Sequence, residues 1–79
     1  MKRYESTKQG KADFVREVLS PLVYQADTGW RGAEYEADEH GEEYVYLLTI
    51  YGAEIGRGKR ILVTGDSVQA IVSDVFNNL

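Results

Sequence analysis

The chain has 79 residues, of which 43% are hydrophobic and 28% are charged, and it carries a formal net charge of −4. A chain of this length and composition is expected to form one small domain, residues 1–79, and is too apolar to be disordered over most of its length. It contains no cysteine, which excludes disulfides and thiolate metal sites. Packing alone, or a partner subunit, must therefore stabilise the core.

The first predicted element is a long amphipathic helix. Its apolar residues recur at intervals of one and four and form a single stripe: Phe14, Val15, Val18, Leu19, Leu22 and Val23. Either Ser6 or Thr7 caps its N-terminus, and residues 1–5 before it are expected to be flexible. Pro21 lacks an amide hydrogen and clashes with the carbonyl four residues earlier. We therefore expect it to kink this helix or to begin a new one.

The second predicted element is a strand from about Arg31 to Asp38 with one acidic face. One parity of this strand holds small or aromatic residues and the other only acids: Ala33, Tyr35 and Ala37 against Glu34, Glu36 and Asp38. Successive side chains of a strand point to opposite faces, so the acids share one face. No Lys or Arg lies between Gly32 and Arg57. The sheet is therefore expected to be acidic at one end.

The apolar run Tyr44–Tyr51 predicts a second strand, joined to the first by a tight turn at His40 and Gly41. This turn, or a loop of four residues, pairs Tyr35 with Tyr46. The parity expected to face the core is then Tyr44, Tyr46, Leu48 and Ile50. The opposite parity is also largely apolar, as in a central strand, and consists of Val45, Leu47, Thr49 and Tyr51.

A glycine-rich loop is expected to lead into a short third strand at Arg60–Thr64. The last predicted element is a helix capped by Asp66 or Ser67. Its apolar residues follow the three-four helical spacing: Val68, Ile71, Val72, Val75, Phe76 and Leu79. Val72 and Phe76 lie in the middle of this stripe, so we expect both to be nearly buried against the sheet.

These elements predict an α+β fold with the order α-β-β-β-α. Two apolar helix stripes need one covering surface. The expected arrangement is thus a three-stranded antiparallel meander, in order 1-2-3, with both helices packed on one face. The other sheet face is then open. We expect it to carry the second parity of the middle strand with an acidic margin: Val45, Leu47, Thr49 and Tyr51, beside Glu34, Glu36 and Asp38. So much uncovered apolar surface favours a binding partner.

Patterns typical of catalysis or metal binding are weak in this sequence. His40 is the only histidine, no serine lies in a nucleophile-elbow pattern, and nothing supplies an apolar pocket around one carboxylate of a pair. Asp38, His40 and Glu42 alternate near a turn, but calcium-loop spacing is absent and zinc needs more His or Cys ligands. We therefore predict no enzymatic activity, no metal, no cofactor and no small-molecule substrate. A weak enzyme or metal site at His40 is an alternative.

Basic residues gather in two segments, the first helix and the loop Gly56–Arg60. The predicted element order is similar to that of double-stranded-RNA-binding domains over nearly the whole chain. The resemblance implies a nucleic-acid-binding module that uses the basic residues of both segments: Lys8, Lys11, Arg57, Lys59 and Arg60. The segments that match the family's lysine cluster and its groove-binding hairpin, Gly65–Gln69 and Asp38–Glu43, contain no Lys or Arg. Because such affinity comes from neutralising phosphates, nucleic acid is the alternative partner and not the favoured one.

The segment Met1–Ser6 lacks the apolar core of a signal peptide, and the longest apolar run, Tyr44–Leu48, is too short to span a bilayer. We therefore expect a soluble, cytoplasmic protein that does not bind membranes. The favoured function is that of a small non-enzymatic interaction or regulatory protein, which binds a protein partner or a second copy of itself. Its predicted contact residues are Glu34, Glu36, Asp38, Val45, Leu47, Thr49 and Tyr51.

Overall fold

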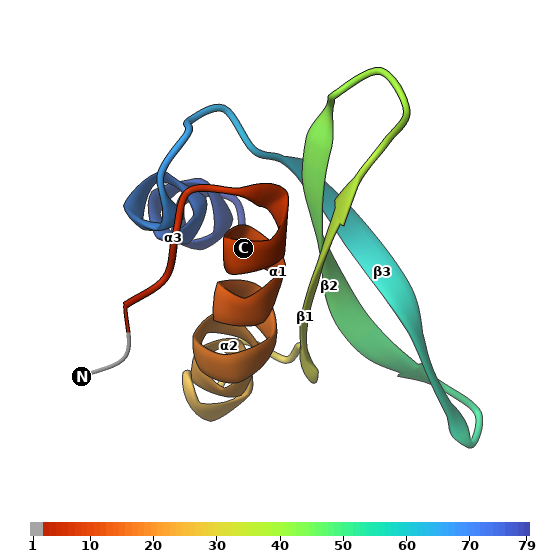
Figure 1. Ribbon diagram of the computed structural model, residues 1–79. Coiled ribbons are helices and arrows are strands. Elements are labelled where there is room, and N and C mark those ends of the chain that lie inside the picture. The colour runs from red at the N-terminus through yellow and green to blue at the C-terminus, as the bar shows by residue number, and fades with distance from the viewer. Residues whose placement is uncertain (1–2) are drawn as a thin grey trace.

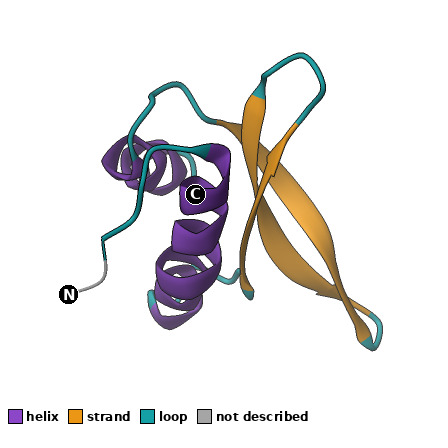
Figure 2. Ribbon diagram, viewed as in Figure 1, coloured by secondary structure: helices purple, strands orange, loops and turns teal. Residues whose placement is uncertain are grey.

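The computed structural model describes residues 3–79 and contains a three-stranded antiparallel sheet in the order β1-β2-β3. The elements along the chain are α1 (Lys8–Phe14), the π-helical turn η1 (Val15–Leu19), α2 (Ser20–Gln25), β1 (Gly32–Ala37), β2 (Glu43–Tyr51), β3 (Glu54–Leu62) and α3 (Val68–Asn77). The helical segments lie on one face of the sheet (Figure 1), and Figure 2 shows the same two layers by secondary structure. The predicted α+β meander with both helices on one face is therefore confirmed.

The segments α1, η1 and α2 follow one another without a break, and Thr7 is their N-cap. The Thr7 hydroxyl accepts a hydrogen bond from the amide of Gly10 at 3.0 Å. Pro21 interrupts the α-helical hydrogen bonding without ending the helix. The residues before it form a π turn, in which the amide of Ser20 donates to the carbonyl of Val15. The proline is thus accommodated by one wider turn.

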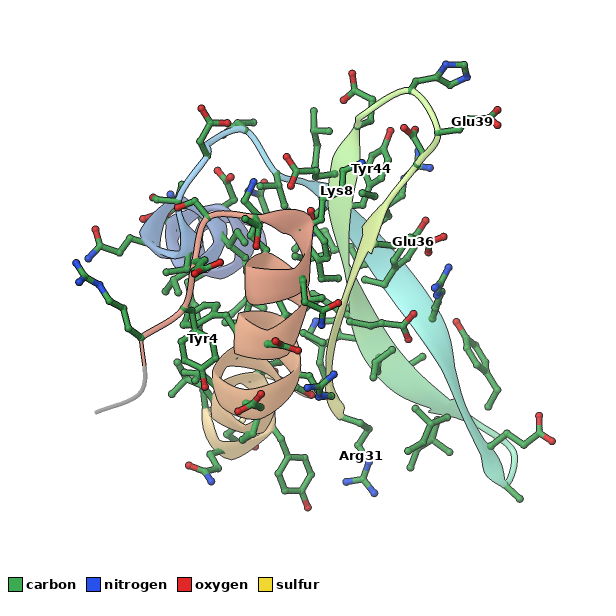
Figure 3. All side chains as sticks on the ribbon, viewed as in Figure 1. Tyr4, Lys8, Arg31, Glu36, Glu39 and Tyr44 are labelled. Carbon is green, nitrogen blue, oxygen red and sulfur yellow. The ribbon has the colours of Figure 1, made fainter. Side chains whose placement is uncertain are left out.

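The described N-terminal residues pack against this helical segment. Tyr4 lies edge-on to Phe14, with ring centroids 5.4 Å apart, and its hydroxyl donates to Glu17 at 3.2 Å. Figure 3 shows Tyr4 beside the helices and away from the sheet. The expectation that residues 1–5 are flexible falls partly on Met1 and Lys2, which lie outside the described residues.

The hairpin between β1 and β2 has a three-residue loop, Glu39–Gly41, and its register differs by one residue from the predicted one. Tyr35 pairs with Val45 instead of Tyr46. Because side chains alternate along a strand, a shift of one residue exchanges its two faces. The predicted inward parity of β2 is therefore wrong, and the side chains that lie away from the helices are those of Tyr44, Tyr46, Leu48 and Ile50.

The side chain of Asp38 stabilises this loop length. Its carboxylate accepts hydrogen bonds from the amides of His40 and Glu42, both at 2.9 Å, and its own amide donates to the carbonyl of Glu42 at 2.8 Å. Gly41 has a φ of 85°, which glycine adopts without a steric penalty. Asp at the first position and Gly at the fourth are preferred in type I turns. Such a turn followed by a left-handed residue closes a three-residue hairpin.

The pairing of β2 with β3 contains a β-bulge opposite Leu47. Tyr46 pairs with Arg60 and Leu48 pairs with Arg57, so β3 has one more residue than β2 between these two pairs. In a regular strand, two residues three positions apart point to opposite faces. The bulge instead places Arg57 and Arg60 on the same face, away from the helices.

Gly58 lies in this bulge, at a position where a side chain has no room. A Cβ atom there would lie 2.5 Å from Cζ3 of Trp30 and 3.0 Å from the carbonyl oxygen of Leu47. We expect Gly58→Ala to displace the Trp30 ring and to destabilise the domain by about 1 to 3 kcal/mol, as overpacking does. Trp30 is the only tryptophan, so its fluorescence emission reports the displacement and a urea titration reports the stability. An unchanged emission spectrum together with an unchanged midpoint would contradict this expectation.

The core lies between the helices and the inner face of the sheet. Its buried apolar residues come from every helix and strand or from the segments next to them: Val15, Leu19, Val23, Ala33, Val45, Leu47, Ile61, Val63, Ile71 and Val75. Helix α3 directs Ile71 and Val75 into this core. Val72 and Phe76 lie at the rim of the same stripe and are only partly buried, so the prediction of their near-complete burial is wrong.

Candidate functional site

The face of the sheet away from the helices is covered by no other element of residues 3–79 (Figure 1). We call it the outer face. Each strand contributes one column of side chains to it. The column on β1 is acidic and consists of Glu34 and Glu36. The column on β2 consists of Tyr44, Tyr46, Leu48 and Ile50, and that on β3 of Ile55, Arg57, Arg60 and Leu62. Figure 3 shows Glu36 on this side of the sheet. Several of its apolar side chains are well exposed, with 45% for Ile50, 67% for Ile55 and 47% for Leu62.

Arg57 connects the two edges of the outer face. Its guanidinium forms ion pairs with Glu34 and Glu36 on β1, and its Cζ lies 4.3 Å from the ring centroid of Tyr46 on the intervening strand. The hydrogen bond to Glu34, above all, raises the pKa of Arg57. These groups are about half exposed, so each pair adds little stability. Together they hold the side chains in one arrangement.

Arg60 is stacked on an aromatic ring but has no carboxylate partner. Its Cζ lies 4.6 Å from the ring centroid of Tyr44, and no acid among residues 3–79 forms an ion pair with it. The outer face thus holds two acids and two arginines and has no net charge, whereas the whole chain has a net charge of −4. The negative charge of the protein lies elsewhere on its surface.

The structure separates the predicted partner-binding residues. Val45 and Leu47 are fully buried under the helices, so the prediction that they lie on the open face is wrong. Their place is a direct result of the one-residue shift in register. Thr49 and Tyr51 share their parity and lie on the inner side, where Tyr51 is exposed beyond the helices and donates to the carbonyl of Arg57 at 3.1 Å. Of the predicted acids, Glu34 and Glu36 lie on the outer face, and Asp38 bonds within its own turn.

The predicted nucleic-acid contacts do not form one basic surface. Lys11 is only 5% exposed and cannot reach a phosphate, which corrects its predicted role. Lys8 is exposed on α1, where Figure 3 labels it. Lys59 donates to the carbonyl of Asn78, which follows α3 on the helical side of the sheet. The predicted loop Gly56–Arg60 is instead part of β3, so that prediction is wrong. Arg57 and Arg60 lie on the outer face, where Arg57 is already paired with two acids.

A partly buried polar cluster of Lys11, Tyr35 and Glu43 was not predicted. The Lys11 ammonium lies 2.8 Å from the Glu43 carboxylate, which also accepts a hydrogen bond from the Tyr35 hydroxyl. Burial, followed by the contact with Glu43, raises the pKa of Tyr35. Burial alone would raise the pKa of Glu43, but the hydrogen bonds from Lys11 and Tyr35 and the charges of Lys11 and Lys8 outweigh it and lower this pKa. The tyrosine stays protonated and the glutamate ionised near neutral pH. The shifts therefore move both groups away from the range of an acid–base catalyst.

The spacing of the helix contains a signal for this cluster. Lys11 precedes Val15, Leu19 and Val23 by four, eight and twelve residues, so it belongs to the stripe that the core covers. Tyr35 lies in the inward parity of β1. A lysine on a buried stripe needs an acid within reach, and the three-residue loop places Glu43 opposite Ala37 at the start of β2.

His40 lies at the tip of the β1–β2 loop, where its side chain is exposed and close to that of Glu39. Within residues 3–79, no group of three or more His, Asp or Glu side chains is arranged to hold a metal ion. In the same part of the chain, no helix is long and apolar enough to cross a membrane. No protein-family model, curated protein or solved structure matches this chain.

Proposed function

We propose that this chain is a small, cytoplasmic, non-enzymatic protein-interaction domain whose contact surface is the outer face of the sheet. The observation that carries the proposal is a face without a covering element that combines stacked tyrosines and arginines with exposed Leu and Ile side chains. Tyrosine and arginine are enriched in the cores of protein interfaces, and lysine is depleted there. The outer face contains no lysine.

The fixed arrangement of these side chains also supports binding. Arg57 lies across Tyr46 between two glutamates, and Arg60 lies on Tyr44. Side chains that are ordered before binding lose less conformational entropy when a partner covers them. The energy of such a surface therefore comes from the apolar area and the stacked rings, while the paired charges determine which partner fits.

The electrostatics of the face favour protein over nucleic acid as its partner. Affinity for a phosphate backbone depends on several unpaired Lys and Arg residues in one surface. Here Arg57 is paired with acids, Lys11 is buried, and the segment between β1 and β2 carries Glu39 and Glu42. The absence of cysteine agrees with a reducing compartment such as the cytoplasm.

Site-specific photo-crosslinking in the cell that makes the protein tests this proposal. A benzophenone side chain is introduced at Ile50 on the outer face or, as a matched control, at Leu22 on α2. The two positions have similar exposure, 45% and 42%. We expect position 50 to give a discrete covalent adduct with a protein and position 22 to give none.

A second substitution shows whether the adduct depends on the face as a whole. Leu62→Lys introduces a charge at the other end of the outer face and is expected to abolish the adduct. Val18→Lys places the same charge on the helical side, at a position that is 38% exposed, and is expected to leave it unchanged. The proposal is wrong if position 50 gives no adduct, or if position 22 gives the same adducts as position 50.

A further inference from the structure

The charges of the outer face are sorted by strand. Both acids lie on β1 at one edge of the sheet, both arginines lie on β3 at the other edge, and β2 between them carries only tyrosines, Leu48 and Ile50. Glu34 and Arg60 lie at the same height along the sheet, because both pair with Tyr46. Such a surface has negative charge at one edge, positive charge at the other and an apolar centre. It is therefore complementary to the same surface of a second copy that faces it.

Only one of the two in-plane symmetry axes matches these charges. A twofold axis parallel to β2, placed between two facing sheets, lays β1 of one copy over β3 of the other at the same height. Glu34 of each copy then faces Arg60 of the other. A twofold axis perpendicular to the strands would instead lay acids over acids and arginines over arginines. Like charges opposed in this way are unfavourable.

We propose that the partner of the outer face is a second copy of this chain, packed sheet against sheet on a twofold axis parallel to β2. This inference rests on the proposed function, to which it adds the identity of the partner. Two facing sheets pack about 10 Å apart with their side chains interdigitated. The central columns of Tyr46 and Leu48 fill this layer, and the contact between Glu34 and Arg60 occurs twice, once on each side of the axis.

The charge of the rest of the protein restricts where two copies can meet. Each chain has a net charge of −4, so most pairs of surfaces repel one another, whereas the outer face is neutral. Arg60 is the group that remains for an intermolecular ion pair, since Arg57 is already paired with Glu34 and Glu36. Glu34 then binds Arg57 of its own chain and Arg60 of the other, as a carboxylate with two oxygens can.

The size of the face sets the strength of the association. Two strands about 30 Å long and one about 20 Å long, spaced about 4.8 Å apart, cover roughly 400 Å² on each copy. This area is below that of standard specific interfaces, which cover about 600 to 1,000 Å² on each partner, so the dimer is weak and its population rises with protein concentration, with a Kd on the order of 10 μM or weaker. A tighter complex would need a larger surface than this sheet provides.

Charge-reversal variants and their mixture test the pairing. Glu34→Arg and Arg60→Glu each place like charges opposite one another in the dimer, so each variant alone is expected to dimerise at least about tenfold more weakly than the wild type. An equimolar mixture of the two variants restores both contacts, because one chain then supplies two arginines and the other two glutamates. Sedimentation equilibrium and native mass spectrometry are expected to show a heterodimer in the mixture.

Two further variants control for net charge. Asp66→Arg and Lys8→Glu change the charge by the same amounts at exposed positions away from the outer face, and are expected to dimerise as the wild type does. Circular dichroism verifies that each variant is folded. If Glu34→Arg disturbs the fold through Arg57, then Glu34→Gln and Arg60→Gln replace the reversals, and each is expected to weaken the dimer.

Three outcomes would overturn the inference. They are a wild-type chain that stays monomeric up to about 1 mM, a dimer that the outer-face variants do not weaken, and a mixture of reversal variants that does not reassociate. The crosslinking at position 50 separates this failure from that of the proposed function. An adduct with twice the mass of the chain supports the proposed function and the second copy as its partner. An adduct with a different protein overturns only the proposal that the partner is a second copy. The absence of any adduct overturns both proposals.

Discussion

Leu47→Ala should destabilise the domain by about 2 to 5 kcal/mol, the usual range for a buried leucine replaced by alanine. The side chain of Leu47 is fully buried in the middle of the central strand, and it packs in the core formed by both helical segments. The alanine leaves a cavity there that the surrounding side chains fill only in part. For a domain of this size, this loss is a large part of the total stability.

Leu48→Ala is the matched control, because it removes the same atoms from the next residue of the same strand. Leu48 lies on the outer face and is only partly buried, so we expect a cost of about 1 kcal/mol or less. Urea denaturation followed by circular dichroism measures both. Equal costs for the two variants, or a larger cost for Leu48→Ala, would mean that β2 presents its other face to the helices.

Lys11→Met should cost about 3 to 5 kcal/mol at neutral pH, because it removes the only cation paired with the Glu43 carboxylate in a mostly buried site, where the Tyr35 hydroxyl remains as a neutral hydrogen-bond donor. The methionine fills a similar volume, so the cost arises from the unpaired charge. Replacement of both partners, Lys11→Met with Glu43→Met, should recover much of this stability. Lys8→Met, one turn earlier at an exposed position, should have only a small effect. Thermal and urea unfolding of the four proteins measure these differences.

The pH dependence of these variants has a defined sign. The pKa of Glu43 is lower in the folded protein than its ordinary value of 4.5, so its ionised form stabilises the fold. This stability is fully present above about pH 4.5 and is lost as the pH falls through the lowered pKa of the folded state. The gap between the wild type and Lys11→Met should therefore be largest at neutral pH and narrow in acid. A gap that widens as the pH falls below 4.5 would contradict the assignment of the pair.

Side-chain periodicity was sufficient to predict the elements and their order. Helix α3 has five apolar residues in helical spacing, and β1 alternates small or aromatic residues with acids, so only one secondary-structure period fits each segment. The two helix stripes then require one sheet face to cover both. The layers of the fold follow from these stripes without any knowledge of individual contacts.

The faces of β2 could not be predicted in the same way, because both of its parities are apolar. Its orientation depends on the length of one loop, and Gly41 suits a turn of two, three or four residues equally well. The Asp38 carboxylate, which accepts two amide hydrogens, selects three residues. This local hydrogen bonding places Val45 and Leu47 in the core and Tyr44 and Tyr46 on the outer face.

The arginines of the candidate site depend on the bulge in the same manner. Arg57 and Arg60 have opposite parities in the sequence, so a regular strand would separate them. The extra residue near Gly58 brings them to one face, and only the packing of Trp30 against that glycine indicates why the bulge is there. Contacts between residues this far apart in the chain have no periodic signal.

The bulge also limits how copies of this protein can polymerise. β3 is an edge strand of nine residues that pairs with β2 on one side alone, and a flat edge of that length is a template for endless strand addition and fibril growth. The extra residue near Gly58 bends this edge, and Arg57, Lys59 and Arg60 place positive charge along it. A further chain therefore cannot extend the sheet in register across the bulge, and concentrated solutions of the protein should stay free of fibrils.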